Sequence, residues 1–125
     1  MPRPARRTLV LGVLGLALLA AAITACSKGS TKPPPVALEL DSGNIHSGNS
    51  YPHTFANPGN YPYCCAIHGC SKMSGSVAVA NGQPASAAVS IVDYAFTPQN
   101  VSVAPGGTVT WTNNSGGTTH TVTSQ

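Results

Sequence analysis

The chain has 125 residues and a mass of 12.6 kDa, which leaves room for one small domain. Only 7% of its side chains are charged, against about a quarter in ordinary soluble domains, and no basic patch contains aromatic residues, so we expect no binding to nucleic acid. The formal net charge of +3 comes from Arg3, Arg6 and Arg7, and the rest of the chain is balanced. The 13 Gly and 11 Pro favour short strands and turns over a helical bundle.

The first 25 residues have the pattern of an export signal. Three Arg and no acidic residue lie within 1–7, and residues 9–23 are apolar or Gly throughout. This pattern predicts a signal peptide over 1–25. Ile-Thr-Ala before Cys26 resembles a bacterial lipobox, which implies that Cys26 receives lipid and becomes the first mature residue. A plain signal peptide or an uncleaved membrane helix stays an alternative, although the apolar run is near the lower limit for a span.

Residues 26–36 are small, polar and rich in Pro, and we expect them to form a tether between the lipid and a domain over 37–125. Turn signals at 57–60 and 105–107 separate runs of alternating apolar residues. No stretch of the domain has convincing helical periodicity. The expected strands cover 36–40, 51–56, 61–65, 75–80, 89–96, 101–103, 108–113 and 118–123. Short strands at this spacing predict an all-β antiparallel sandwich or barrel of about seven or eight strands.

The densest group of chemically reactive side chains is Cys65, His68 and Met73, spaced as Cys-x2-His-x4-Met. Soft sulfur ligands together with imidazole select copper over hard cations, and an electron-transfer copper site needs a second His beside a weak axial Met. His120 in Thr-Thr-His-Thr-Val is the candidate for that second His. We therefore predict one copper ion per domain. His46 and His53 lie outside any ligand motif and are expected to be surface or structural residues.

The domain resembles the plastocyanin-like branch of the cupredoxins. Residues 61–68 (Tyr-Pro-Tyr-Cys-Cys-Ala-Ile-His) are similar to the family's block around the ligand Cys, and 73–77 to its axial Met and last strand. Residues 94–113 resemble the opening strands, 119–122 the strand of the first ligand His, and 41–55 the middle of the fold. The resemblance implies a Greek-key sandwich with a type 1 copper site, in which the family's C-terminal ligand His reaches the surface and passes electrons. That position is His68 in this chain.

The order of these segments is reversed relative to the family. Residues 37–80 correspond to the later half of the usual order, 81–88 to a linker, and 89–125 to the opening half. This order predicts a circular permutation, in which Gln125 would lead into 38–41 in the ordinary chain. Surface termini that lie close together tolerate such a change. We expect a monomer, and two half-domains completed by a second chain in a swapped dimer stay the alternative.

Two cysteines are left over once Cys26 is assigned to the lipid and Cys65 to copper. Exported proteins meet an oxidising environment, so Cys64 and Cys70 are candidates for a disulfide that braces the ligand loop. Since neighbouring strand residues point to opposite faces, Cys64 should face away from the copper. The competing interpretation is a zinc site built from Cys64, Cys65, His68 and Cys70, which would leave Met73 and His120 without a role.

We expect an electron carrier rather than an enzyme, because Asp93 and Glu39 are too isolated for paired acid–base chemistry. Its partners would be redox proteins of the same compartment, and the domain would sit in the periplasm or the extracellular space, held to the membrane by the lipid anchor. A copper-binding module for storage, sensing or delivery is the alternative function. A metal-free adhesion sandwich is a third, against which the intact ligand set argues.

Overall fold

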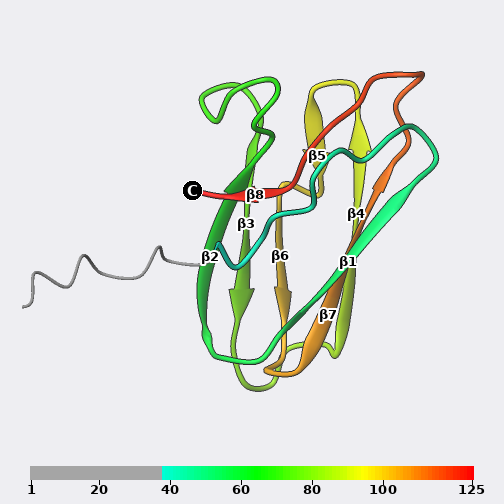
Figure 1. Cartoon of the computed structure of the whole chain (residues 1–125). Helices are drawn as coiled ribbons and strands as arrows, with labels where there is room; N and C mark the ends of the chain where they lie inside the picture. Colours follow the sequence, from blue (N-terminus) through cyan, green and yellow to red (C-terminus); the bar gives the residue numbers. More distant parts are fainter. Residues whose placement is uncertain (1–37) are drawn as a thin grey trace, which may run out of the picture. The chain divides into compact units, whose positions relative to one another are not determined.

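The computed structural model describes residues 38–125. The predicted signal peptide, Cys26 and the tether lie outside the described residues. Figure 1 shows strands on two sides of a common core. The strands are β1 (Ser50–Phe55), β2 (Gly59–Cys64), β3 (Ser74–Val79), β4 (Ser86–Val92), β5 (Ala95–Thr97), β6 (Asn100–Val103), β7 (Gly107–Asn113) and β8 (Thr123–Ser124). Over 38–125 no helix is long and apolar enough to cross a membrane. The expected all-β class is confirmed.

Two four-stranded sheets make up the sandwich, with strand orders β1-β7-β4-β5 and β6-β3-β2-β8. In each sheet, strands from the first half of the domain pair with strands from the second half. β7 lies beside β1, β6 beside β3, and β8 beside β2. The two halves are therefore joined by backbone hydrogen bonds within a single chain.

The expectation of a wholly antiparallel sheet is wrong for two pairs of strands. β3 runs parallel to β6, and β4 runs parallel to β7, so both sheets are mixed and neither closes into a barrel. Alternation of apolar and polar residues shows which face of a strand is buried but carries no information on its direction. Parallel neighbours need a long crossover connection, and here each parallel pair joins strands that do not follow one another in the chain.

Several expected strand boundaries also differ. The run 89–96 contains the end of β4, a turn at Asp93 and Tyr94, and the start of β5, with Asp93 at a φ of 51°. Asp is among the few non-glycine residues that adopt this left-handed conformation readily, so the chain turns there. The expected strand 118–123 is reduced to an isolated bridge at His120 and the start of β8, and 38–40 form no strand.

The segment that begins the described domain lies beside the segment that ends it. Asp41 bridges Thr123 in antiparallel fashion, and Ile45 bridges His120. The Ser124 N–H donates to the Leu40 carbonyl at 2.9 Å, while the Leu40 N–H donates to Ser124 Oγ at 2.9 Å. The two segments therefore run antiparallel and side by side, like the two strands of a hairpin.

Aromatic side chains from both sheets meet in the core. The Tyr63 ring of β2 meets Phe96 and Trp111 of the opposite sheet edge to face, at centroid distances of 4.9 and 5.2 Å. Tyr63 and Trp111 are both completely buried. Such contacts add to the stabilisation from burying apolar surface. They also place Tyr63, two residues before Cys65, rigidly between the sheets.

We expect Gly75→Ala to lower the free energy of unfolding by about 1–3 kcal/mol, because the position has no room for a side chain. A Cβ there would lie 2.4 Å from the Gln99 carbonyl oxygen and 2.6 Å from the Tyr63 ring. Chemical denaturation of the metal-free protein measures the effect. Gly116→Ala is the matched control, since a Cβ at Gly116 would meet no atom within 4 Å. Equal unfolding midpoints for the two variants would contradict the packing around Gly75.

Candidate metal centre

Cys65, His68 and His120 converge at one end of the sandwich. Their ligand atoms all lie within 4.8 Å of one another. Cys65 Sγ is 3.3 Å from His68 Nδ1 and 3.9 Å from His120 Nδ1. Cys65 and His120 are completely buried, whereas His68 is half-buried. A thiolate and two imidazoles in this arrangement could hold a metal ion. The structure thus brings together three of the four ligands expected from the sequence.

The loop after β2 positions Cys65 and His68. The Gly69 N–H donates to the Cys65 carbonyl at 3.0 Å, and the Met73 N–H donates to the Gly69 carbonyl at 3.1 Å. The Cys65 N–H in turn donates to the Met73 carbonyl at 3.0 Å. The backbone of Met73 is therefore hydrogen-bonded to that of Cys65. The Met73 side chain is buried and, together with Phe96, lines a cavity of about 210 Å³. Its role as axial ligand stays a prediction.

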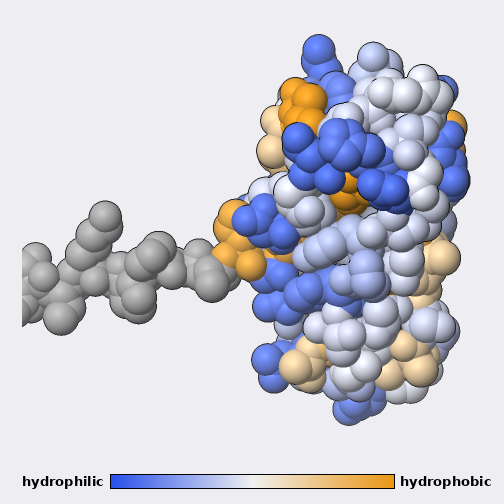
Figure 2. All heavy atoms as spheres, turned by 45° about the vertical axis from the view of Figure 1, so that its right-hand side comes forward, coloured by the Kyte–Doolittle hydropathy of each residue, from blue (hydrophilic) through white to orange (hydrophobic). Residues whose placement is uncertain are grey.

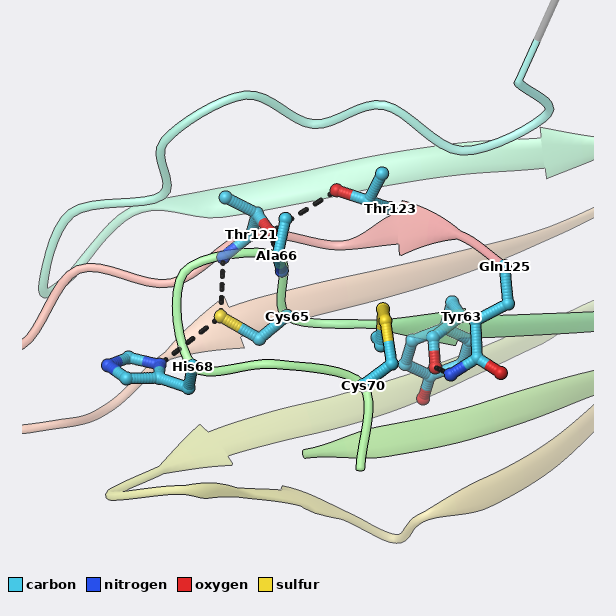
Figure 3. The surroundings of a disulfide bond; sticks show 9 residues. Tyr63, Cys65, Ala66, His68, Cys70, Thr121, Thr123 and Gln125 are labelled. Atoms are coloured by element: carbon cyan, nitrogen blue, oxygen red, sulfur yellow. Dashed lines mark hydrogen bonds between the residues drawn. A yellow bond between two sulfur atoms is a disulfide. The ribbon is translucent and has the colours of Figure 1, made fainter. Parts of the chain in front are cut away.

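Thr121 connects the segment of His120 to the loop of Cys65 (Figure 3). Its N–H donates to Cys65 Sγ at 3.4 Å, and its Oγ1 accepts the Ala66 N–H at 2.8 Å. Cysteine binds a metal as the thiolate, and this N–H would remain a hydrogen-bond donor to the sulfur in the metal-loaded site. The sequence analysis did not single out Thr121; its only signal was its position directly after a candidate ligand.

Ser115 orients His120 from the side opposite the cluster. Its Oγ donates to the Ile91 carbonyl at 3.4 Å and lies 3.0 Å from His120 Nε2. With the proton on Nε2, His120 would donate to this hydroxyl and leave the lone pair of Nδ1 directed at Cys65. Asn113, at the end of β7, holds the segment that leads to His120 in place. Its Nδ2 donates to the carbonyls of Ile45 and Thr118 at 2.8 and 2.7 Å. Second partners of this kind fix the tautomer of a ligand His.

Burial lowers the pKa of His120 from its usual value near 6.5, the charge of His68 lowers it further, and Asp93 opposes the shift. The folded state then binds protons less readily than the unfolded state, so this contribution to stability is present above about pH 6.5 and declines as the pH falls. We expect the metal-free protein to lose stability through that window, measured as the denaturation midpoint against pH. The decline should be smaller in His120→Gln, and an unchanged decline would contradict this role.

Cys64 and Cys70 form a disulfide six positions apart across the ligand loop. Figure 3 shows it on the side of the chain away from the Cys65 sulfur. Among residues 38–125, Cys65 is the one free cysteine. The competing zinc site of Cys64, Cys65, His68 and Cys70 is therefore not available in this oxidised state, because two of its thiols are bonded to each other.

The other two histidines lie apart from the cluster. His46 Nδ1 is 3.1 Å from Thr119 Oγ1, and His53 Nε2 is 3.0 Å from a Glu39 carboxylate oxygen. Neither belongs to the group whose ligand atoms converge. They serve as control positions for metal binding.

His68 faces the surface beside Tyr94. The two rings meet edge to face with centroids 4.9 Å apart, and together with Lys72 they line a depression of about 420 Å³. Tyr94, which lines the depression, is 62% exposed, and Ile67, next to His68 in the chain, is 51% exposed. On the face drawn in Figure 2, apolar residues form small separate patches among polar ones.

Comparisons with protein-family models, with curated proteins and with solved structures returned no match. The function of this chain is therefore inferred from the convergence of Cys65, His68 and His120 and from the surroundings of these residues.

Proposed function

We propose that this protein is a type 1 copper-binding electron carrier rather than an enzyme. The observation that carries the proposal is the buried group of one thiolate and two imidazoles, with both histidine Nδ1 atoms directed at Cys65 Sγ. This donor set is soft and nearly enclosed, which favours copper over hard cations. Met73 would complete it as the weak axial ligand. Copper bound there would supply a one-electron Cu(I)/Cu(II) couple.

The residues around Cys65 and His120 support electron transfer, because they would hold the ligands in nearly the same geometry in both oxidation states of the metal. Cys65 is held by backbone hydrogen bonds and by Thr121, while His120 is held by Ser115. Ligands held in this way by the loop after β2 and by the segment between β7 and β8 would resist rearrangement between oxidation states, so little reorganisation would accompany the transfer of an electron. His68, half-buried in the lining of the surface depression, would be the point of electron exchange.

We assign the fold to the plastocyanin-like cupredoxins in a circularly permuted form. The hydrogen bonds between Leu40 and Ser124 support this assignment. They bring the two ends of the domain together, so a short link between 125 and 38 would recreate the ordinary chain order. The predicted linker over 81–88, of which 86–88 belong to β4 in the structure, would be the bridge that replaces the family's original ends. We propose that the two halves pair within one chain to give a monomer; a swapped dimer, which would use the same strand pairs, is the alternative.

The proposed setting comes from the sequence. The signal peptide and Cys26 would place the lipid-anchored domain in the periplasm or the extracellular space, where it meets redox proteins of the same compartment. The part of the chain after residue 25 has balanced charges, so salt should weaken partner docking only slightly.

Titration of the full chain with Cu(II) under absorption spectroscopy tests the proposal. We expect one copper per chain and an intense blue band, with the same result in the control variants His46→Gln and His53→Gln. Fast reversible reduction on an electrode would support electron transfer, and slow irreversible reduction would favour copper storage or delivery. A chain that is folded yet takes up no copper would overturn the proposed function.

A further inference from the structure

The described domain has one side chain with a permanent positive charge, and it lies beside the proposed point of electron exchange. Residues 38–125 contain no Arg and a single Lys, Lys72. The same stretch contains three acidic residues, which are Glu39, Asp41 and Asp93. Lys72 is exposed and lines the surface depression together with His68 and Tyr94. The one cation of an otherwise acidic domain is therefore placed where electrons would be exchanged.

The ligand loop fixes the position of Lys72. Its N–H donates to the Gly69 carbonyl at 3.0 Å, and the residue that follows, Met73, is buried. The Lys72 side chain also lines the cavity beside Met73, and Tyr94 is the other residue that the cavity and the depression share. Lys72 and Tyr94 therefore stand together on the surface next to His68.

No acidic side chain of the described domain forms an ion pair with Lys72. Within residues 38–125 the one ion pair joins His53 to Glu39. Asp93 comes just before Tyr94 in the chain but does not line the depression. An exposed ammonium group attracts anions over a distance of about 10 Å at 0.1 M salt. The depression therefore presents a positive charge that a partner with a carboxylate would complement.

We propose that the partner of this protein is an acidic redox protein, which places a carboxylate against Lys72 when its redox group faces His68. This inference rests on the proposed electron-transfer function. The depression offers one ammonium group beside two aromatic rings, whereas a site for a small anion would need several converging donors. Tyrosine is enriched at protein interfaces, and the Tyr94 ring is exposed there. The docked pair exchanges one electron, so the donor is oxidised and the acceptor reduced with no bond formed or broken.

A single charge pair would orient the partner and speed its encounter more than it would add affinity. Its contribution falls with salt, but one pair gives only a shallow dependence. The charge on Lys72 thus provides selectivity between acidic and basic partners.

Paramagnetic broadening of NMR signals tests this docking site in the metal-free full chain. The probes are two redox-inert complexes of similar size, the anion hexacyanochromate(III) and the cation hexaamminechromium(III). At low salt we expect the anion to broaden the ring signals of His68 and Tyr94 most, and the cation to leave them sharp. Lys72→Gln should reduce this broadening about 3-fold or more.

Asn81→Asp is the matched control, because it changes the net charge by the same amount far from the depression. Asn81 is exposed in the turn between β3 and β4, at the end of the sandwich opposite the ligand loop (Figure 1). This variant should keep the broadening. Broadening that is centred away from the depression, or that Lys72→Gln leaves unchanged, would overturn the inference.

Electron transfer with cytochrome c, native and succinylated, tests the kind of partner. Native cytochrome c is basic, and succinylation replaces its lysine charges with carboxylates. In stopped-flow mixing with the copper-loaded chain at low salt, Lys72→Gln should slow the reaction with the succinylated form about 3-fold or more relative to Asn81→Asp, and should not slow the reaction with the native form. Broadening by the anion without this kinetic difference would indicate a small anion as the occupant and overturn the protein partner. If the chain binds no copper, the proposed function fails, and the NMR measurement still decides whether Lys72 forms an anion-docking site.

Discussion

Cys65→Ser is expected to abolish the blue colour of the copper-loaded protein and to weaken copper binding on the order of 1,000-fold, about 4 kcal/mol. The intense colour requires a thiolate bonded to copper, and Cys65 supplies the only free thiol in the described part of the chain. A serine hydroxyl is a hard, protonated donor that suits copper poorly. Absorption spectra and copper affinity by competition titration measure both effects.

The matched control is the double variant Cys64→Ser/Cys70→Ser, which also replaces cysteines but leaves Cys65 in place. We expect it to keep the blue band, because the disulfide lies on the side of the loop away from the Cys65 sulfur. A blue spectrum in Cys65→Ser, or its loss in a folded double variant, would show that a different cysteine holds the metal.

His68→Gly and His120→Gly should both lose the blue spectrum, and added imidazole should restore it only in His68→Gly. Removing either ring leaves a cavity and one ligand fewer. At His68 this cavity would open onto the surface depression beside Tyr94 and Lys72, so a small molecule can enter. His120 is completely buried beside Ser115 and Ile45 and is not part of the lining of that depression, so imidazole should reach its cavity far less readily.

Titration of each copper-loaded glycine variant with imidazole measures the recovery. His53→Gly is the control, since it should remain blue without imidazole. Recovery of His120→Gly at the same imidazole concentration as His68→Gly would contradict the difference in access, and with it the assignment of His68 as the point of electron exchange.

Local features of the chain were enough to predict the all-β class and the ligand motif. Val77 and Val79 alternate with small residues, Pro and Gly mark the turns, and Cys65 stands three residues before His68. These features depend on residues close in sequence, where period and spacing carry the information. The turn at Asp93 was missed because the apolar run 89–96 continues across it.

Residue types named His120 and the Cys64–Cys70 pair as candidates, but local patterns do not show which distant residues meet. The sequence by itself determined a soft metal-binding motif on a β-rich domain, since both follow from residue types at short spacing. Only the tertiary structure decided the rest: His120 beside Cys65, parallel pairing of β3 with β6 and of β4 with β7, and Cys64 bonded to Cys70. The physical reason is that strand direction, sheet order and the meeting of distant side chains depend on how the two sheets close over one core, which no local pattern records.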